Sequence, residues 1–236
     1  MELFFTTPDQ IKDTIAEFDR FESQHILKTL RKKKGDSIHF TDGRGRLFSG
    51  TIMETRPLLT VRHELLKELP QPEVSIHLAV GFIRHTRLDF IIEKGTELGV
   101  QKFYLLATRH SNYFTANTIR WQKIARQAIK QSIRFFLPEI SVSDSLSACL
   151  PHLPESSLKI VLEQSAGESL SEILLKANSS LYKDIIFLIG PEGGLGNEEL
   201  ELARSRDFKL VTLGEHRMRT ETAALVAAAA AGLLLK

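Results

Sequence analysis

The sequence predicts an α/β protein in two parts: a small β-rich domain over residues 1–70 and a parallel-sheet domain over residues 73–236. Before residue 70, short segments rich in β-forming residues are separated by glycine turns, which is typical of a small barrel or sandwich. After residue 72, apolar strands alternate with helical patterns, which is typical of a mostly parallel sheet with helices on both faces. Pro70 and Pro72 lie where the pattern changes, so we place the domain boundary there.

The N-terminal part is predicted to contain one helix followed by short strands. The helix covers residues 21–30, and the strands cover 37–41, 47–54 and 58–63. Turn-forming residues mark each connection, because glycine, proline and aspartate favour tight turns. These segments are Gly35-Asp36, Asp42-Gly43-Arg44-Gly45 and Arg56-Pro57.

The second part is predicted to hold five short strands, because its apolar runs show little alternation and are expected to be buried on both faces. These strands cover residues 74–82, 103–107, 158–162, 185–189 and 210–213. Helices are predicted where apolar residues recur at helical spacing or where a cap precedes acidic residues. They cover 88–98 and 119–136, and two more begin near Asn197 and Thr220.

The composition, 42% hydrophobic and 25% charged, is that of an ordinary globular chain. A single cysteine, Cys149, excludes a disulfide framework within the chain and a cysteine-based zinc site, and we expect no bound metal. Glu2 and Asp9 lie where a signal peptide would be basic and then apolar. The longest apolar run, residues 223–235, is too short to span a bilayer. We therefore expect a cytoplasmic protein that does not bind a membrane.

The formal net charge of +2 hides an uneven distribution along the chain. Residues 73–134 carry ten basic against four acidic residues, whereas residues 135–236 are acidic overall. A local basic cluster lies at residues 28–34. Clustered positive charge binds phosphate backbones, although such a cluster also occurs as a plain solvated face. The charge pattern is compatible with a nucleic-acid partner and does not decide the question alone.

A glycine-rich segment, residues 190–196, follows the strand predicted over 185–189. Ligands of open α/β sheets bind at the carboxyl ends of strands, so this loop is well placed for a site. It lacks the Gly-Lys-Ser/Thr ending of a phosphate-binding P-loop, and Pro191 and Glu192 disrupt the dinucleotide fingerprint. Glu192 favours a ligand that carries positive charge. The alternative is a tight turn without a ligand.

A second loop of the same kind, residues 213–219, follows the last predicted strand. Thr220 is expected to cap the final helix, which leaves Glu221 in the first turn, where the helix dipole favours acids. The alternative is a helix cap with an ordinary surface loop. Two such loops after neighbouring strands would form one cleft.

These two loops resemble those of the bacterial 16S rRNA uracil-N3 methyltransferases, which belong to the SPOUT class of knotted, S-adenosylmethionine-dependent RNA methyltransferases. Further matching motifs extend the resemblance over nearly the whole chain, in order. They are His25…Leu30-Arg31…Gly35-Asp36, Asp42-Gly43-Arg44-Gly45, Lys94…Glu97-Leu98-Gly99-Val100 and Gln131-Ser132-Ile133-Arg134…Pro138. The chain departs from the family in lacking an arginine near its N-terminus and in carrying Met218 where leucine is usual.

The resemblance implies a PUA-like RNA-binding barrel over residues 1–70 and a SPOUT methyltransferase domain with a C-terminal trefoil knot over residues 73–236. It also implies a homodimer that acts on 16S rRNA or the small ribosomal subunit with S-adenosylmethionine. The cofactor-binding residues would be Leu162, Ile189, Gly190, Glu192, Gly193, Gly194, Leu213, Gly214, Met218 and Thr222. The RNA-binding residues would be Lys28, Arg31, Lys32, Lys33, Lys34, Arg84, Arg87, Lys94, Lys123, Lys130 and Arg134.

Methylation of uracil N3 requires loss of a proton, and the negative charge then spreads over the flanking carbonyl oxygens. Arg219 is our candidate for stabilising this charge, and Glu221 for orienting that arginine or accepting the proton. The alternative is a purely structural Arg219–Glu221 ion pair. His85, His110 and His216 lie near the predicted loops, but single histidines are more often ordinary surface or core residues.

Three other functions are considered. A SPOUT ribose 2′-O-methyltransferase would typically carry a Ser-Leu-Asn type element where this chain has residues 219–222, Arg-Thr-Glu-Thr. A non-catalytic RNA-binding factor for ribosome assembly would be favoured if the glycine loops had been lost. A nucleotide-utilising enzyme would need a phosphate-binding lysine beside the glycines, and none is present there.

Overall fold

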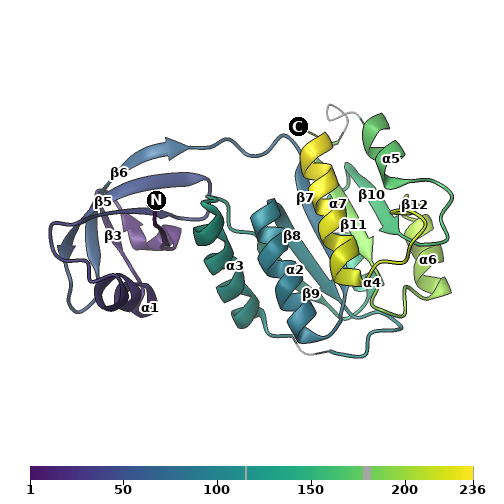
Figure 1. The fold of residues 1–236 in the computed structure, drawn as a ribbon, viewed down its shortest axis with the longest axis horizontal. Helices are drawn as coiled ribbons and strands as arrows, with labels where there is room; N and C mark the ends of the chain where they lie inside the picture. Colours follow the sequence, from purple (N-terminus) through teal and green to yellow (C-terminus); the bar gives the residue numbers. More distant parts are fainter. Residues whose placement is uncertain (115, 178–181, 236) are drawn as a thin grey trace. The chain divides into compact units, whose positions relative to one another are not determined.

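The computed structural model describes residues 1–114, 116–177 and 182–235 (Figure 1). Two compact units are found, each with its own hydrophobic core. The first unit comprises Met1–Gln71 together with Arg126–Leu137, and the second comprises Pro72–Ala125 together with Pro138–Lys236. The division between them therefore also passes through the helix α3 (Thr118–Ser132).

The first unit is built on a six-stranded sheet with the order β1-β4-β5-β6-β3-β2. Its strands are β1 (Leu3–Phe5), β2 (Ile11–Lys12), β3 (Ile15–Glu17), β4 (Ser37–Thr41), β5 (Arg46–Glu54) and β6 (Thr60–Glu68). Only β1 and β4 run parallel. Among the described residues β1 and β2 do not pair, so the sheet is open and forms a half-barrel.

Three strands of this sheet, β1 to β3, are absent from the sequence prediction, because two or three residues are too few to show a period. The helix predicted over 21–30 is found as α1 (Arg20–Gln24) continued by the π-turn η2 (His25–Thr29), and a short 3₁₀ turn, η1 (Pro8–Gln10), precedes it. The strand predicted to end at residue 63 continues to Glu68. Its second half is largely exposed, which hid it from a pattern based on buried residues.

The second unit contains a parallel six-stranded sheet with the order β12-β10-β11-β7-β8-β9. The strands are β7 (Ser75–Gly81), β8 (Val100–Leu106), β9 (Glu139–Ser143), β10 (Ser157–Leu162), β11 (Asp184–Ile189) and β12 (Lys209–Val211). The predicted α/β architecture with a parallel sheet is confirmed. The prediction of five strands is wrong by one, because β9 is an edge strand of mixed, partly exposed residues that lacks a buried run.

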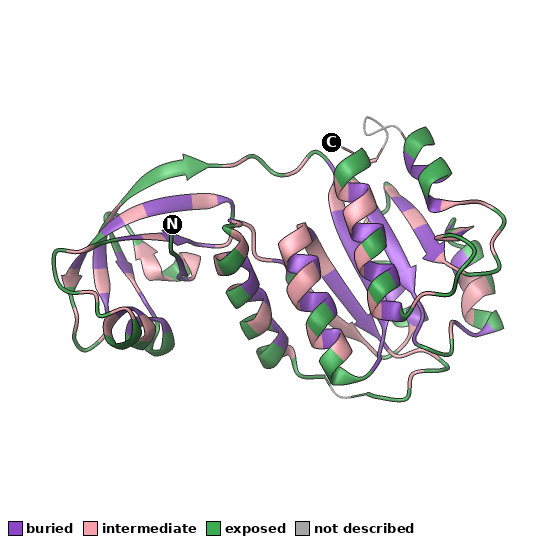
Figure 2. Cartoon of the chain, viewed as in Figure 1, coloured by how far each residue is buried: buried purple, intermediate pink, exposed green. Residues whose placement is uncertain are grey.

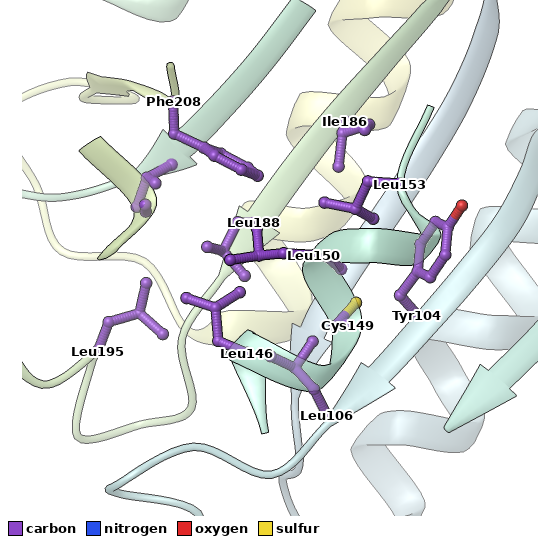
Figure 3. Packing of buried hydrophobic residues seen from close by; sticks show 13 residues of the cluster. Tyr104, Leu106, Leu146, Cys149, Leu150, Leu153, Ile186, Leu188, Leu195 and Phe208 are labelled. Carbon is purple, nitrogen blue, oxygen red and sulfur yellow. The ribbon is translucent and has the colours of Figure 1, made fainter. Parts of the chain in front are cut away.

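Helices cover both faces of this sheet, which explains its uninterrupted apolar strands (Figures 1 and 2). On one face α2 (His85–Leu98) and α7 (Thr220–Leu234) pack against each other, and α7 lies on β7 and β11. A cluster around Leu188 and Cys149 forms the core of the other face (Figure 3). It contains residues of α4 (Leu146–Cys149), η3 (Leu150–His152) and α6 (Asn197–Arg204).

One further helix, α5 (Leu170–Lys176), packs against α7. In the part of the chain that the structure describes, no helix is both long and apolar enough to cross a membrane. The same residues contain no group of three or more His, Cys, Asp or Glu side chains placed to hold a metal ion.

Candidate functional site

A cavity of about 740 Å³ lies at the carboxyl ends of β10 and β11 in the second unit. Three loops form most of its wall: residues 163–169 after β10, residues 190–196 after β11 (the glycine loop) and residues 212–219 after β12 (the C-terminal loop). The start of α2 and the start of α7 complete it. Its volume lies within the range of small-molecule sites, roughly 300–1,000 Å³.

Hydrogen bonds between these loops hold the cavity together. The Gln164 side-chain amide donates to the carbonyl oxygens of Gly214 (3.0 Å) and Glu215 (3.2 Å) in the C-terminal loop. Arg217 donates through Nη2 to the carbonyl oxygen of Glu192 at 2.6 Å. The buried Thr220 hydroxyl donates to the carbonyl oxygen of Gly190 at 3.0 Å. The C-terminal loop is thus tied to both of the other loops.

The glycine loop folds back on itself, and this requires a glycine at its first position. A Cβ atom at Gly190 would lie 2.7 Å from the carbonyl carbon of Gly194 and 2.8 Å from the amide nitrogen of Leu195. The turn is closed by a hydrogen bond from Gly194 N–H to the carbonyl oxygen of Pro191 at 2.8 Å, and Gly194 has a φ of +75°. Residue 190 therefore cannot carry a side chain without displacement of the backbone.

The structure brings most of the predicted cofactor residues to this one cavity. Lining it are Leu162, Ile189, Gly190, Glu192, Gly193, Gly194, Leu213 and Met218. Gly214 and Thr222 are not among the lining residues. Gly214 lies behind the wall with a φ of +132°, and Thr222 is exposed on α7. Ala223, one helical step later, lines the cavity.

The two predicted catalytic residues do not pair with each other. Arg219 lines the cavity and is exposed, and its guanidinium has no hydrogen bond or ion pair within the described residues. Glu221 pairs with Arg87 of α2 instead, with 3.6 Å between its Oε1 and Arg87 Nε. The alternative of a structural Arg219–Glu221 pair is therefore not what the geometry shows.

Arg87 lies in the wall of the cavity, although the sequence analysis grouped it with the RNA-binding residues. Its Nη1 donates to Glu192 Oε1 at 2.8 Å, in addition to the contact with Glu221. The second oxygen of Glu221, Oε2, is buried and has no hydrogen-bond partner. Arg87, Glu192 and Glu221 form a charged cluster, which we call the Arg87 cluster.

The basic cluster at residues 28–34 lies in the first unit, beside a second cavity of about 600 Å³. Lys28, Lys32, Lys33 and Lys34 line this basic groove together with Arg20 and Arg56. Arg31 is exposed outside the lining, with a φ of +57°.

Other predicted RNA-binding residues are engaged within the protein. Lys130 pairs with the buried Glu22 at 2.8 Å, and burial lowers the pKa of the Arg134 guanidinium. Lys94 lies between Glu93 and Glu97, whose hydrogen bonds raise the pKa of its ammonium to about 12. Arg84 and Lys123 are exposed.

The histidines and the cysteine have structural surroundings. His110 packs beside Gly193, and its Nδ1 lies 3.2 Å from the carbonyl oxygen of Gly194, so it supports the glycine loop. His85 makes an edge contact with the ring of Tyr113, and His216 is exposed. Burial raises the pKa of the Cys149 thiol to about 11, as expected of a core residue and not of a nucleophile.

Sequence reasoning missed the side chains that join the loops, chiefly Gln164 and Arg217, and the place of Arg87. Gln164 follows β10 by two residues, so its position at the carboxyl end of a buried strand was an available signal. No comparable signal exists for Arg87, because its partners lie more than a hundred residues away in the sequence.

A family model for an RNA methyltransferase domain matches residues 70–232. The ribosomal RNA small subunit methyltransferase E of Rickettsia conorii is 32% identical over 214 residues, which cover 89% of this chain and 86% of that protein.

Two solved structures superimpose over nearly the full length. The ribosomal RNA small subunit methyltransferase E of Neisseria gonorrhoeae, bound to S-adenosylmethionine, gives a TM-score of 0.82 at 25% identity, covering 98% of this chain and 96% of that one. A probable rRNA methyltransferase from Porphyromonas gingivalis gives 0.79 at 29% identity, covering 97% and 95%. The chain therefore belongs to the ribosomal RNA small subunit methyltransferase E family, and it is an RNA methyltransferase that uses S-adenosylmethionine.

Proposed function

We propose that this protein methylates N3 of a uridine in 16S rRNA. The observation that carries the proposal is the cavity enclosed by the glycine loop and the C-terminal loop, with the unpaired guanidinium of Arg219 on its wall. Membership in the family assigns S-adenosylmethionine to this cavity, and the exposed arginine suits an acceptor that becomes anionic.

The residues of the cavity suit S-adenosylmethionine in size, shape and charge. Apolar side chains of Leu162, Ile189 and Leu213 offer a surface for the adenine ring, and the glycine loop offers backbone groups. The carboxylate of Glu192 complements a positively charged ligand. When bound, the cofactor supplies a methyl group that is already activated on a sulfonium, so the protein has mainly to align the acceptor with it.

The protein's own chemistry concerns the proton and the charge of the uracil. N3 carries a proton at neutral pH and becomes a nucleophile when that proton is removed. Arg219 stabilises the negative charge that develops on the uracil carbonyl oxygens, because a guanidinium placed beforehand in a partly dry site needs little reorganisation. Glu221 accepts the proton as the general base.

The first unit serves as the RNA-binding domain in this proposal, as a PUA-like half-barrel that presents the basic groove to the phosphate backbone. A trefoil knot is supported by the contacts of the chain after β12, since this segment is bonded to the glycine loop before α7 lies on β7 and β11. We further propose a cytoplasmic homodimer, because exposed apolar residues of α7, such as Val226 and Leu233, suit a helix interface.

Methylation of naked 16S rRNA and of assembled small subunits, followed by mass spectrometry of the nucleosides, tests this function. The expected product is 3-methyluridine. A 2′-O-methylated nucleoside would select the ribose methyltransferase, and RNA binding without any methylated product would select the assembly factor.

An Arg219→Ala variant tests the assigned chemistry. Its turnover is expected to fall by at least about 10²-fold, while its affinity for S-adenosylmethionine, measured by calorimetry, stays close to that of the wild type. An equal loss of cofactor binding would contradict the role of Arg219.

A further inference from the structure

One guanidinium in the wall of the cavity joins two acidic residues from different loops. Arg87, in the first turn of α2, donates through Nη1 to Glu192 Oε1 at 2.8 Å, and its Nε lies 3.6 Å from Glu221 Oε1. Glu192 belongs to the glycine loop, and Glu221 begins α7. Arg87 is therefore the point at which α2, the glycine loop and α7 meet through charge.

Glu221 is held in an unusual way by this contact. Its side chain is only 13% exposed, and while Oε1 faces Arg87, the buried Oε2 has no hydrogen-bond partner among the described residues. Buried carboxylate oxygens normally accept hydrogen bonds, so a free one next to a ligand cavity favours a ligand that brings a donor. The N3–H group of uracil is a donor of this kind.

An arginine can make both contacts at once, and a lysine cannot make them in the same way. The guanidinium is planar and carries donors that point in fixed directions, so Nη1 and Nε can address two carboxylates together. The ammonium of lysine is a compact point charge on a flexible chain. Arg219 precedes Glu221 in the chain but has no ion pair with it in the described structure, so Arg87 and Glu192 are the charged groups that define its surroundings.

We propose that Arg87 is a positioning residue that aims the carboxylate of Glu221 at the N3–H group of the target uracil. In the step concerned, the N3–H bond breaks, its proton passes to Glu221 Oε2, and the electron pair remains on N3. This leaves N3 able to accept the methyl group. The inference rests on the proposed function, since it assigns to Arg87 a part in the deprotonation of uracil.

A double-mutant cycle tests the inference. The rate constant kcat is measured for wild type, Arg87→Ala, Glu221→Gln and the double variant on the same 16S rRNA substrate. We expect Glu221→Gln to lower kcat by about 10²-fold or more, as for loss of a general base, and Arg87→Ala to lower it by about 10- to 100-fold. If Arg87 acts through Glu221, the double variant is no slower than Glu221→Gln alone.

Three further measurements separate positioning from a merely structural role. The dissociation constant for S-adenosylmethionine and the Tm of Arg87→Ala should stay close to those of wild type. An Arg87→Lys variant should recover part of kcat, because it retains the charge but not the double contact. Arg120→Ala is the matched control. Arg120 also pairs with a carboxylate of α2, Asp89 at 2.7 Å, but does not line the cavity, and kcat should be unchanged.

The inference is overturned if the double variant loses the full product of the two single losses, if Glu221→Gln remains fully active, or if the loss in Arg87→Ala follows from weaker cofactor binding. Each of these outcomes leaves the wild-type product as 3-methyluridine and so leaves the proposed function intact. Failure of the proposed function shows itself differently, because the wild type then forms another product or none.

Discussion

Replacing Gly190 with alanine is expected to open the glycine loop and weaken the binding of S-adenosylmethionine. The added Cβ would lie 2.7 Å from the carbonyl carbon of Gly194, whereas ordinary contacts begin at 3.4 Å. The loop must therefore move by about 0.7 Å, the difference between these distances, and the atoms in the way are backbone atoms that cannot rotate aside.

The movement also affects the C-terminal loop, because the carbonyl oxygen of Gly190 accepts the hydrogen bond of the buried Thr220 hydroxyl. Overpacking of this kind costs about 1–3 kcal/mol. If the cost falls on the conformation that binds the cofactor, the dissociation constant rises by roughly 5- to 150-fold, since about 1.4 kcal/mol corresponds to a factor of ten.

Calorimetric titration with S-adenosylmethionine measures the effect directly. Gly167→Ala is the matched control, because a Cβ at Gly167 meets nothing within 4 Å and its φ is not in the left-handed region. The control should bind as wild type does. If Gly190→Ala binds the cofactor as tightly as wild type with an unchanged Tm, the close approach does not constrain the cavity and the reasoning fails.

Three other predictions concern stability and reactivity. Lys130→Ala should lower the free energy of unfolding by about 3–5 kcal/mol in urea, because it leaves Glu22, whose side chain is 6% exposed, without its cation; Lys102→Ala, which breaks a pair with the exposed Glu139, should cost about 1 kcal/mol or less. Burial, opposed by the hydrogen bond with Asp184, lowers the pKa of His77, so below pH 6.5 the unfolded chain takes up a proton before the native one does. The stability contributed by His77 is therefore lost as pH falls below 6.5, and the advantage of wild type over His77→Gln should shrink there by at most about 1.4 kcal/mol per pH unit; a constant difference would contradict this. Cys149, with its pKa raised to about 11, should resist iodoacetamide at pH 8, where about one thiol in a thousand is ionised, and react in urea.

The central strands of the second unit could be predicted because burial on both faces leaves a direct mark in the sequence. The prediction placed strands at 74–82 and 185–189, and the structure has β7 (Ser75–Gly81) and β11 (Asp184–Ile189) there. Elements at the edges, such as β9, follow a weaker rule. One side of an edge strand faces solvent or a loop, so its residues need not be apolar, and pairing with a neighbour decides its conformation.

The site was predictable to the extent that it depends on strand ends. Glycines that follow buried strands placed the glycine loop and the C-terminal loop, because parallel strands bring their carboxyl ends to one edge. The partners of the charged residues were not predictable. Glu221 pairs with Arg87 because α7 packs against α2, and this packing depends on the whole fold and not on any local pattern.

The start of α7 shows how a known rule could have refined the prediction. Residues three apart on a helix share a face, whereas a residue two positions on points away from it. Thr220 bonds to Gly190, and so Ala223 should also face the cavity while Thr222 should not, which is what the structure has. The sequence analysis placed Thr222 in the cofactor site because it followed the order of the family motif and not the helical period. Once the helix is known to begin at Thr220, the period alone assigns these side chains correctly.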